Sequence, residues 1–170
     1  MNEQISKTPK LVRDLMTVGV STCGTDTPVT TIAEAILEKE LEAIVVLDEE
    51  GHALGIVGQD ELIGAYCRED FLNLTAEDIL REGVPQIPTD IPLRAAAQMM
   101  KDEKIRGYFL MHHAGGIGYP AAVISYKHFL RHMAMKNPGD IKDLGINAER
   151  EAPLDSFIER RDSKKRKAGI

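Results

Sequence analysis

Two basic side chains, Lys104 and Arg106, stand out in the segment EKIRG (residues 103–107) for the chemistry that they offer. A guanidinium presents a planar fork of donors that matches a phosphate group, and an ammonium adds a compact positive charge. The two residues are therefore candidates for binding an anion. The alternative is that both are solvated loop charges, which is the usual state of lysine and arginine.

Histidines offer a second kind of chemistry, metal binding. His128 and His132 have the spacing that places two side chains on one face of a helix, and His112 and His113 are adjacent. A zinc site needs at least three protein ligands, and the sequence identifies no third ligand for either pair. The H-E-x-x-H motif is also absent. We therefore expect no metal site.

Motifs for catalysis are missing from the chain. It contains no G-x-S-x-G, no glycine-rich loop ending in Gly-Lys-Ser/Thr and no G-x-G-x-x-G after a strand. Neither Cys23 nor Cys67 has a neighbouring histidine that would activate it. The glycines of AGGIGYP (residues 114–120) are expected in a hairpin turn. The sequence predicts that the protein is not an enzyme.

The elements that must position Lys104 and Arg106 belong to an internal repeat. Residues 26–47, DTPVTTIAEAILEKELEAIVVL, return 64 residues later as DIPLRAAAQMMKDEKIRGYFLM, and Glu40 and Glu42 precede Lys104 and Arg106 at this offset. A unit this small does not fold well alone, so we expect two copies to pack around a shared seam. Concave ligand pockets tend to form at such seams.

Each copy is predicted to be strand, helix, strand, strand, helix. Apolar residues at helical spacing follow Pro28 and Pro92, and each helix is followed by a run that is typical of a strand, AIVVLD in the first copy and YFLMH in the second. The second turn is expected to be three residues longer, which raises the offset from 64 to 67. The expected segments in the first copy are a helical lead (10–16), an opening strand (19–23), strands (43–48 and 54–58) and a last helix (60–67); their counterparts are 75–80, 84–88, 108–112, 121–125 and 126–136.

Length, charge and cysteine content limit the class of protein to which the chain can belong. A chain of 170 residues with 43% hydrophobic content can bury one compact core or two small packed ones. A net charge of −6 argues against nucleic-acid binding, and no apolar run is long enough to cross a membrane. Two cysteines without metal spacing suit a reducing compartment, so we expect a cytoplasmic protein.

The order of these motifs, found twice, carries a family resemblance. An apolar pair, an extended V-x-T segment, an amphipathic helix and a G-I-V ending occur in DLMTVGVSTCGTDTPV and AIVVLDEEGHALGIVGQDEL and again in the second copy. The chain resembles a tandem pair of CBS domains, a Bateman module. The resemblance implies an α+β fold in which two β-α-β-β-α repeats pack sheet to sheet as one pseudo-twofold module. The expected divisions are an N-terminal lead (1–9), a first repeat (10–73), a second repeat (74–136) and a C-terminal extension (137–170) that is mobile with a basic end.

The resemblance also implies a non-catalytic regulatory module that binds an adenine-type nucleotide (AMP, ADP or ATP), S-adenosylmethionine or another small anion between the repeats. The family's ligand motif, G-h-x-S/T-x-x-D, is altered twice. Gly58 and Glu61 replace its hydroxyl and its aspartate in the first repeat, and His128 replaces the aspartate in the second, where Ser125 is kept.

Ligand-binding roles follow from the resemblance. Phosphate is assigned to Ser125, Lys104 and Arg106, the ribose carboxylate position to Glu61 or His128, and the base or sugar pocket to Gln86, Ile87 and Ile124. The resemblance implies a homodimer and no required cofactor. The alternative is a degenerate CBS-pair scaffold that binds no nucleotide and acts through dimerisation and an unidentified effector protein.

Overall fold

The computed structural model describes residues 11–136. The predicted N-terminal lead and C-terminal extension lie outside the described residues. The predicted α+β class is confirmed. The elements are α1 (Val12–Leu15), β1 (Thr17–Val18), β2 (Thr22–Gly24), α2 (Val29–Glu38), β3 (Ala43–Leu47), β4 (Ala53–Gly58), α3 (Gln59–Tyr66), the short helix η1 (Phe71–Asn73), α4 (Ala76–Ile79), β5 (Arg81–Glu82), α5 (Leu93–Glu103), β6 (Gly107–Ala114), β7 (Ile117–Ser125) and α6 (Tyr126–Ala134).

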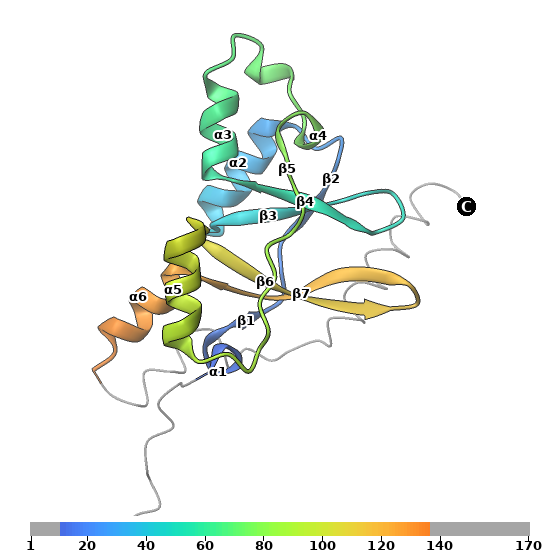
Figure 1. The fold of residues 1–170 in the computed structure, drawn as a ribbon. Coiled ribbons are helices and arrows are strands. Elements are labelled where there is room, and N and C mark those ends of the chain that lie inside the picture. Colours follow the sequence, from blue (N-terminus) through green and yellow to red (C-terminus); the bar gives the residue numbers. More distant parts are fainter. Residues whose placement is uncertain (1–10, 137–170) are drawn as a thin grey trace, which may run out of the picture.

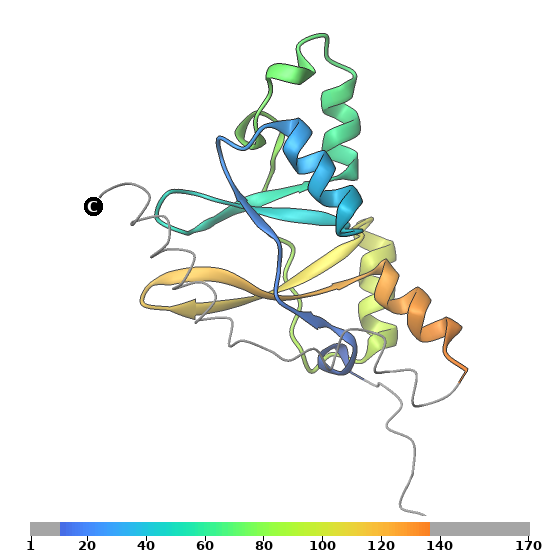
Figure 2. The same cartoon turned by 180° about the vertical axis from the view of Figure 1, so that it is seen from behind.

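Two sheets form the centre of the molecule. One has the strand order β1-β7-β6 and the other has the order β2-β3-β4-β5. Helices α2 and α3 lie with the four-stranded sheet, and α5 and α6 lie with the three-stranded sheet (Figure 1). All four helices lie at one end of the molecule, and both hairpin turns lie at the other, as the reverse view also shows (Figure 2).

The segment before each amphipathic helix crosses from one sheet to the other. β1 pairs antiparallel with β7, with Thr17 opposite Val123, and β2 then pairs with β3 of its own repeat. β5 does the same in the second repeat, with Arg81 opposite Ile56 of β4. These pairs keep the predicted offsets of 64 and 67 residues. The single opening strand predicted over 19–23 is therefore wrong, because two short strands in different sheets take its place.

Glycine makes this crossing possible. Gly19 and Gly83 follow β1 and β5 and have φ values of +92° and +80°. A residue with a Cβ atom rarely adopts this left-handed region. The two glycines are 64 residues apart, so both crossings have a glycine with a positive φ at the equivalent position.

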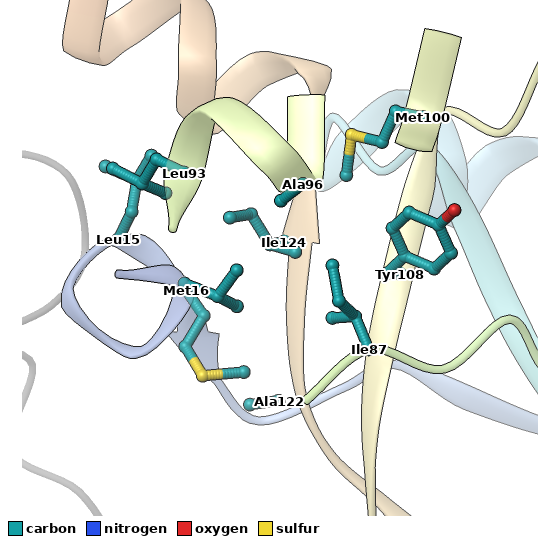
Figure 3. Close-up of a cluster of buried hydrophobic side chains, with 10 residues drawn as sticks. Leu15, Met16, Ile87, Leu93, Ala96, Met100, Tyr108, Ala122 and Ile124 are labelled. Atoms are coloured by element: carbon teal, nitrogen blue, oxygen red, sulfur yellow. The ribbon is translucent and has the colours of Figure 1, made fainter. Parts of the chain in front are cut away.

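The short helices α1 and α4, which begin the two repeats, are exchanged between the repeats in the same way. α1 packs into the core of the second repeat, against Leu93 and Met100 of α5 and Ile124 of β7, as Figure 3 shows for Leu15 and its neighbours. α4 packs into the first repeat, where Ala76 joins a cluster of residues from α2, β3 and β4. A further cluster, built on Val45, Ile56 and Phe109, joins strands of both sheets, which agrees with the predicted sheet-to-sheet packing.

The second hairpin differs from the prediction. Its turn is not longer, because Gly115 and Gly116, with φ values of +60° and +80°, connect β6 to β7 directly. Two consecutive positive φ values are typical of the tight type I′ turn. The additional residues lie in the strands, since β6 and β7 have 8 and 9 residues while β3 and β4 have 5 and 6.

Candidate functional site

A cavity of about 250 Å³ lies between the two repeats. The crossing segments, the loops that enter β3 and β6 and the N-termini of α3 and α6 all contribute to it. The first repeat supplies Thr17 and residues 19–21, residues 39–43, Ile56 and residues 58–61, and the second supplies Arg81, Lys104, Arg106, Gly107, Phe109, Val123, Ser125, Lys127, His128 and Arg131.

The charged part of this lining is mostly basic. Six cationic side chains face four acidic ones, although the whole chain has a net charge of −6. A concave site with an excess of one charge raises the local concentration of ligands of the opposite sign. The electrostatics of the cavity therefore favour an anion. The cationic residues are Lys39, Arg81, Lys104, Arg106, Lys127 and Arg131, and the acidic ones are Glu40, Glu42, Asp60 and Glu61.

His128 is held at the N-terminus of α6 by contacts on both ring nitrogens. The backbone N–H of Ser125 donates to its Nδ1 at 3.0 Å, and the Ser125 hydroxyl lies at the same distance from that nitrogen. The Oγ1 of Thr17 lies 2.8 Å from Nε2. Because Nδ1 accepts the backbone N–H, the proton of the neutral ring is assigned to Nε2, which donates to Thr17.

The surroundings keep His128 uncharged. Its exposed fraction is 7%, and burial, followed by the positive charge of Arg131, lowers its pKa to about 4. At neutral pH the ring therefore has no charge, and both of its nitrogens are occupied within the chain. In this conformation His128 has no nitrogen left to accept a hydrogen bond from a ligand hydroxyl.

Glu61 occupies the equivalent position in the first repeat, 67 residues earlier. Its Oε2 accepts the backbone N–H of Gly58 at 2.9 Å, and its Oε1 lies 3.8 Å from Nε of Arg81. Arg81 is 64 residues after Thr17, so the same pair of positions is in contact in both repeats. In each, the third residue of the helix caps its own helix and meets a side chain of the crossing strand.

Two further contacts join the repeats beside the cavity. Arg106 donates from Nη1 to Oε1 of Gln59 at 3.1 Å, and its Nη2 lies 3.5 Å from Oδ1 of Asp60. Lys127 donates to the backbone carbonyl of Glu40 at 2.6 Å and lies 3.1 Å from its carboxylate. The hydrogen bond from Lys127, together with its charge, lowers the pKa of the Glu40 carboxyl.

The loops and helices that form these contacts have opposite charges in the two repeats. Glu40 and Glu42 are equivalent to Lys104 and Arg106, and Asp60 is equivalent to Lys127. The loop of the first repeat is acidic and meets a basic helix, whereas the loop of the second repeat is basic and meets an acidic helix. Opposite charges therefore face one another on both sides of the seam.

Lys104 differs from the other cations around the cavity in its backbone conformation. It ends α5 in the left-handed conformation, with φ of +55°. Within residues 11–136, no carboxylate pairs with it. Glu40, its counterpart, has φ of +50°. A side chain costs about 1 kcal/mol in this region relative to glycine, so two charged residues are kept here at a cost in stability.

The structure brings most of the sequence-predicted site residues together. Five of them line the cavity: Lys104, Arg106, Ser125, His128 and Glu61. The other three lie outside this lining. Ile87 and Ile124 are buried in the core of the second repeat (Figure 3), and Gln86 is exposed where it bridges to β6. Alternation along β7 explains Ile124, because neighbours in a strand point to opposite faces and Ser125 faces the cavity.

Sequence reasoning missed the partners of these residues. Thr17 and Arg81 touch His128 and Glu61 only because their strands pair with the other repeat. Lys127 and Arg131 could have been assigned to the site from the sequence, since their spacing places them on one face of the helix that carries His128.

Other chemistries find little support among the described residues. No group of three or more His, Cys, Asp or Glu side chains in residues 11–136 is arranged to hold a metal ion. None of the helices in this range is long and apolar enough to cross a bilayer. Binding of a small anion is what the arrangement of the lining suits best.

Two interlocked α+β repeats with a cavity at their seam define a tandem-repeat module. The CBS domain family model matches residues 12–68 and 76–135, so the chain belongs to the CBS domain family. No curated protein sequence matches the chain.

Solved structures show the same fold. A CBS-domain-containing protein from Agrobacterium tumefaciens, ATU1752, matches with a TM-score of 0.65 and 20% identity over 78% of this chain and 99% of its own. The CBS domain pair of protein MJ0100, in complex with 5′-methylthioadenosine and S-adenosyl-L-methionine, matches with a TM-score of 0.63 and 18% identity over 75% and 98%. CBSX2 in complex with AMP matches with a TM-score of 0.58 and 18% identity over 73% and 96%.

Proposed function

We propose that this protein is a non-catalytic regulatory module that senses a small anionic ligand in the cavity between its repeats. The single observation that carries the proposal is the excess of cationic side chains around a seam cavity in an acidic protein. Lys104 and Arg106 hold the anion, with Ser125 at the start of α6 beside them. The output comes from ligand-dependent repacking of the two repeats.

Adenine compounds are the first candidates for the ligand. The structural neighbours whose complexes contain AMP, S-adenosyl-L-methionine and 5′-methylthioadenosine support this choice. Binding requires rearrangement, because Arg106 must leave Gln59 and Asp60 to reach a phosphate. Glu61 is the better of the two positions for a ribose, since its contact with Arg81 at 3.8 Å is long.

The test is binding of AMP, ADP, ATP, S-adenosylmethionine and inorganic phosphate, measured by thermal shift and then by calorimetry. A ligand that binds the native state raises its stability by mass action. Arg106→Ala should raise the dissociation constant by a factor corresponding to about 1 to 3 kcal/mol, the usual cost of losing a charge-assisted hydrogen bond. Lys101→Ala is the matched control, because this exposed cation of α5 does not line the cavity.

Lys104→Gly separates a binding role from a structural one. Glycine relieves the left-handed strain at this helix end, so the variant should be more stable by about 1 kcal/mol. It should also bind the ligand more weakly, because the free ammonium is lost. A variant that gains stability but keeps its affinity would remove Lys104 from the site.

A second function is favoured by one specific observation. Glu61 and His128, the residues at the ribose positions, are both engaged within the chain. This favours the degenerate scaffold, which binds no nucleotide and acts through a homodimer and an effector protein. The absence of a shift with every compound in the panel, with an intact fold, would establish the scaffold in place of the sensor.

A homodimer is part of both proposals. Large apolar side chains are exposed on the helical end of the molecule, on both α3 and α6. Contiguous exposed apolar surface marks interaction sites.

A further inference from the structure

Most of the cationic side chains that line the cavity gather where α6 begins. Lys127 and Arg131 lie one turn apart on this helix, and Lys104 and Arg106 lie in the loop that enters β6. This loop contacts the helix directly, because the N–H of Tyr126 donates to the carbonyl oxygen of Arg106 at 3.0 Å. Four cations of the second repeat therefore lie around one end of the cavity.

The first repeat adds a fifth cation, Lys39, at the same place. Its neighbour Glu40 is held by Lys127, whose Nζ lies 3.1 Å from the carboxylate, so the loop that enters β3 lies against α6. Lys39, Lys104 and Arg131 make no ion pair with a carboxylate of residues 11–136. Because like charges gathered in one cavity repel one another, an anion with several negative charges suits this cluster better than a single charge does.

The groups that would recognise a ribose are already used within the chain. His128 has one nitrogen on the N–H of Ser125 and the other on Thr17. Glu61 uses one carboxylate oxygen to accept the N–H of Gly58 at 2.9 Å. A ribose hydroxyl must displace an existing hydrogen bond to bind His128, so the exchange gains little free energy.

A base finds no exposed ring in the cavity on which to stack. Among the described residues that line it, only Phe109 and His128 have rings, and they are 2% and 7% exposed. Phe109 is packed with Val45 and Ile56 between the two sheets. The cavity volume of about 250 Å³ also lies below the roughly 300 to 1,000 Å³ of pockets that bury a drug-sized ligand.

From these observations we infer that the cavity recognises a compact polyanion, a pyrophosphate or triphosphate group, and gains little affinity from a nucleoside attached to it. The inference rests on the anion site of the proposed function and narrows its ligand class. Lys39, Lys127 and Arg131 join Lys104 and Arg106 as ligands of the polyanion, since guanidinium and ammonium groups form charge-assisted hydrogen bonds to phosphate oxygens. ADP and ATP then bind by their phosphates.

Calorimetry on the full chain compares pyrophosphate with ADP and tripolyphosphate with ATP, at constant ionic strength and without divalent cations. The two dissociation constants of each pair should agree within about threefold, and adenosine should not bind. ADP binding at least about tenfold tighter than pyrophosphate, or saturable binding of adenosine, would overturn the inference and leave the anion site intact. If no compound binds, the inference and the proposed function both fail.

A charge deletion on α6 tests the enlarged cation cluster. Arg131→Ala should weaken pyrophosphate and ADP by the same factor, about tenfold, because both are held by their phosphates. Arg94→Ala makes the same change of charge on the exposed face of α5, outside the cavity lining, and should leave both affinities unchanged. Weaker binding of ADP alone would contradict the inference.

A carboxylate deletion should have the opposite effect. The Oδ1 of Asp60 lies 3.5 Å from Nη2 of Arg106 and competes with the polyanion for this cation. Asp60→Asn should therefore tighten binding of both pyrophosphate and ADP, whereas Glu38→Gln, an exposed carboxylate of α2 outside the lining, should not. Such a gain cannot result from a damaged fold, and its absence for pyrophosphate would count against the cluster.

Discussion

His128 is kept neutral by its surroundings, and this has a measurable consequence for stability. Its pKa in the folded protein is about 4, lowered first by burial and then by Arg131, whereas an unperturbed histidine titrates near 6.5. A group whose folded pKa is depressed stabilises the protein above its unfolded pKa. That stability is lost as the pH falls from about 6.5 towards 4, because the unfolded chain then binds the proton more readily.

The pH dependence of unfolding tests this point. Between pH 7 and pH 4 the wild-type protein should lose about 3 kcal/mol through this residue, since one pKa unit corresponds to about 1.4 kcal/mol. His128→Asn keeps an acceptor for the Ser125 N–H but cannot titrate, so its free energy of unfolding should fall less steeply in urea titrations over the same range. Parallel curves for the two proteins would contradict the neutral, buried histidine.

The candidate site was predictable from the sequence where it depends on the repeat. Glu61, Ser125 and His128 follow from the ligand motif of the family that the chain resembles, read in both copies, and Lys104 and Arg106 follow from the charge difference between equivalent loops. Their partners were not predictable, because a strand pattern does not say which sheet the strand joins.

At the scale of elements, β4 of the first repeat and β5 of the second approach each other tightly at Gly55. A Cβ atom on Gly55 would lie 2.1 Å from the carbonyl oxygen of Arg81 and 2.9 Å from Cδ1 of Leu80. These strands cannot separate without breaking the pairing of Gly55 with Glu82. Gly55→Ala should therefore lower the free energy of unfolding by about 2 kcal/mol or more, as overpacking of a core does.

Gly107→Ala is the control for this substitution. A Cβ atom on Gly107, at the start of β6, would meet its nearest neighbour at 3.5 Å, an ordinary van der Waals contact. Its free energy of unfolding should change by less than about 0.5 kcal/mol. Urea unfolding of both variants measures the difference, and equal stabilities would show that β4 and β5 can move apart freely.

The elements themselves were largely predictable, and their connections were not. Hydrophobic periodicity identified the helices after Pro28 and Pro92, because one face of each is buried. Short apolar runs on either side of turn residues identified both hairpins. It did not show that the segment 17–24 divides between two sheets, since short extended runs look alike in either. The turn at Gly115 was assigned to the correct residues, but the added length lies in the strands.

At the scale of the whole molecule, each repeat contributes its first short helix and its crossing strand to the other repeat. α1 completes the core of the second repeat, and α4 completes the core of the first. The cluster of Val45, Ile56 and Phe109 lies between the sheets and belongs to both. Neither repeat can unfold alone without exposing the core of its neighbour, so the cavity between them depends on a single cooperative unit.

The residues of the two cores should therefore unfold together. Urea titration followed by NMR should give the same midpoint for the amide of Val46, in the first core, and that of Tyr108, in the second. Gly55→Ala should lower both midpoints equally, although the substitution lies in the first repeat, because β5 connects it to the second. Two separate midpoints, or a shift confined to Val46, would show that the repeats are stable independently and that ligand binding at the seam need not alter both.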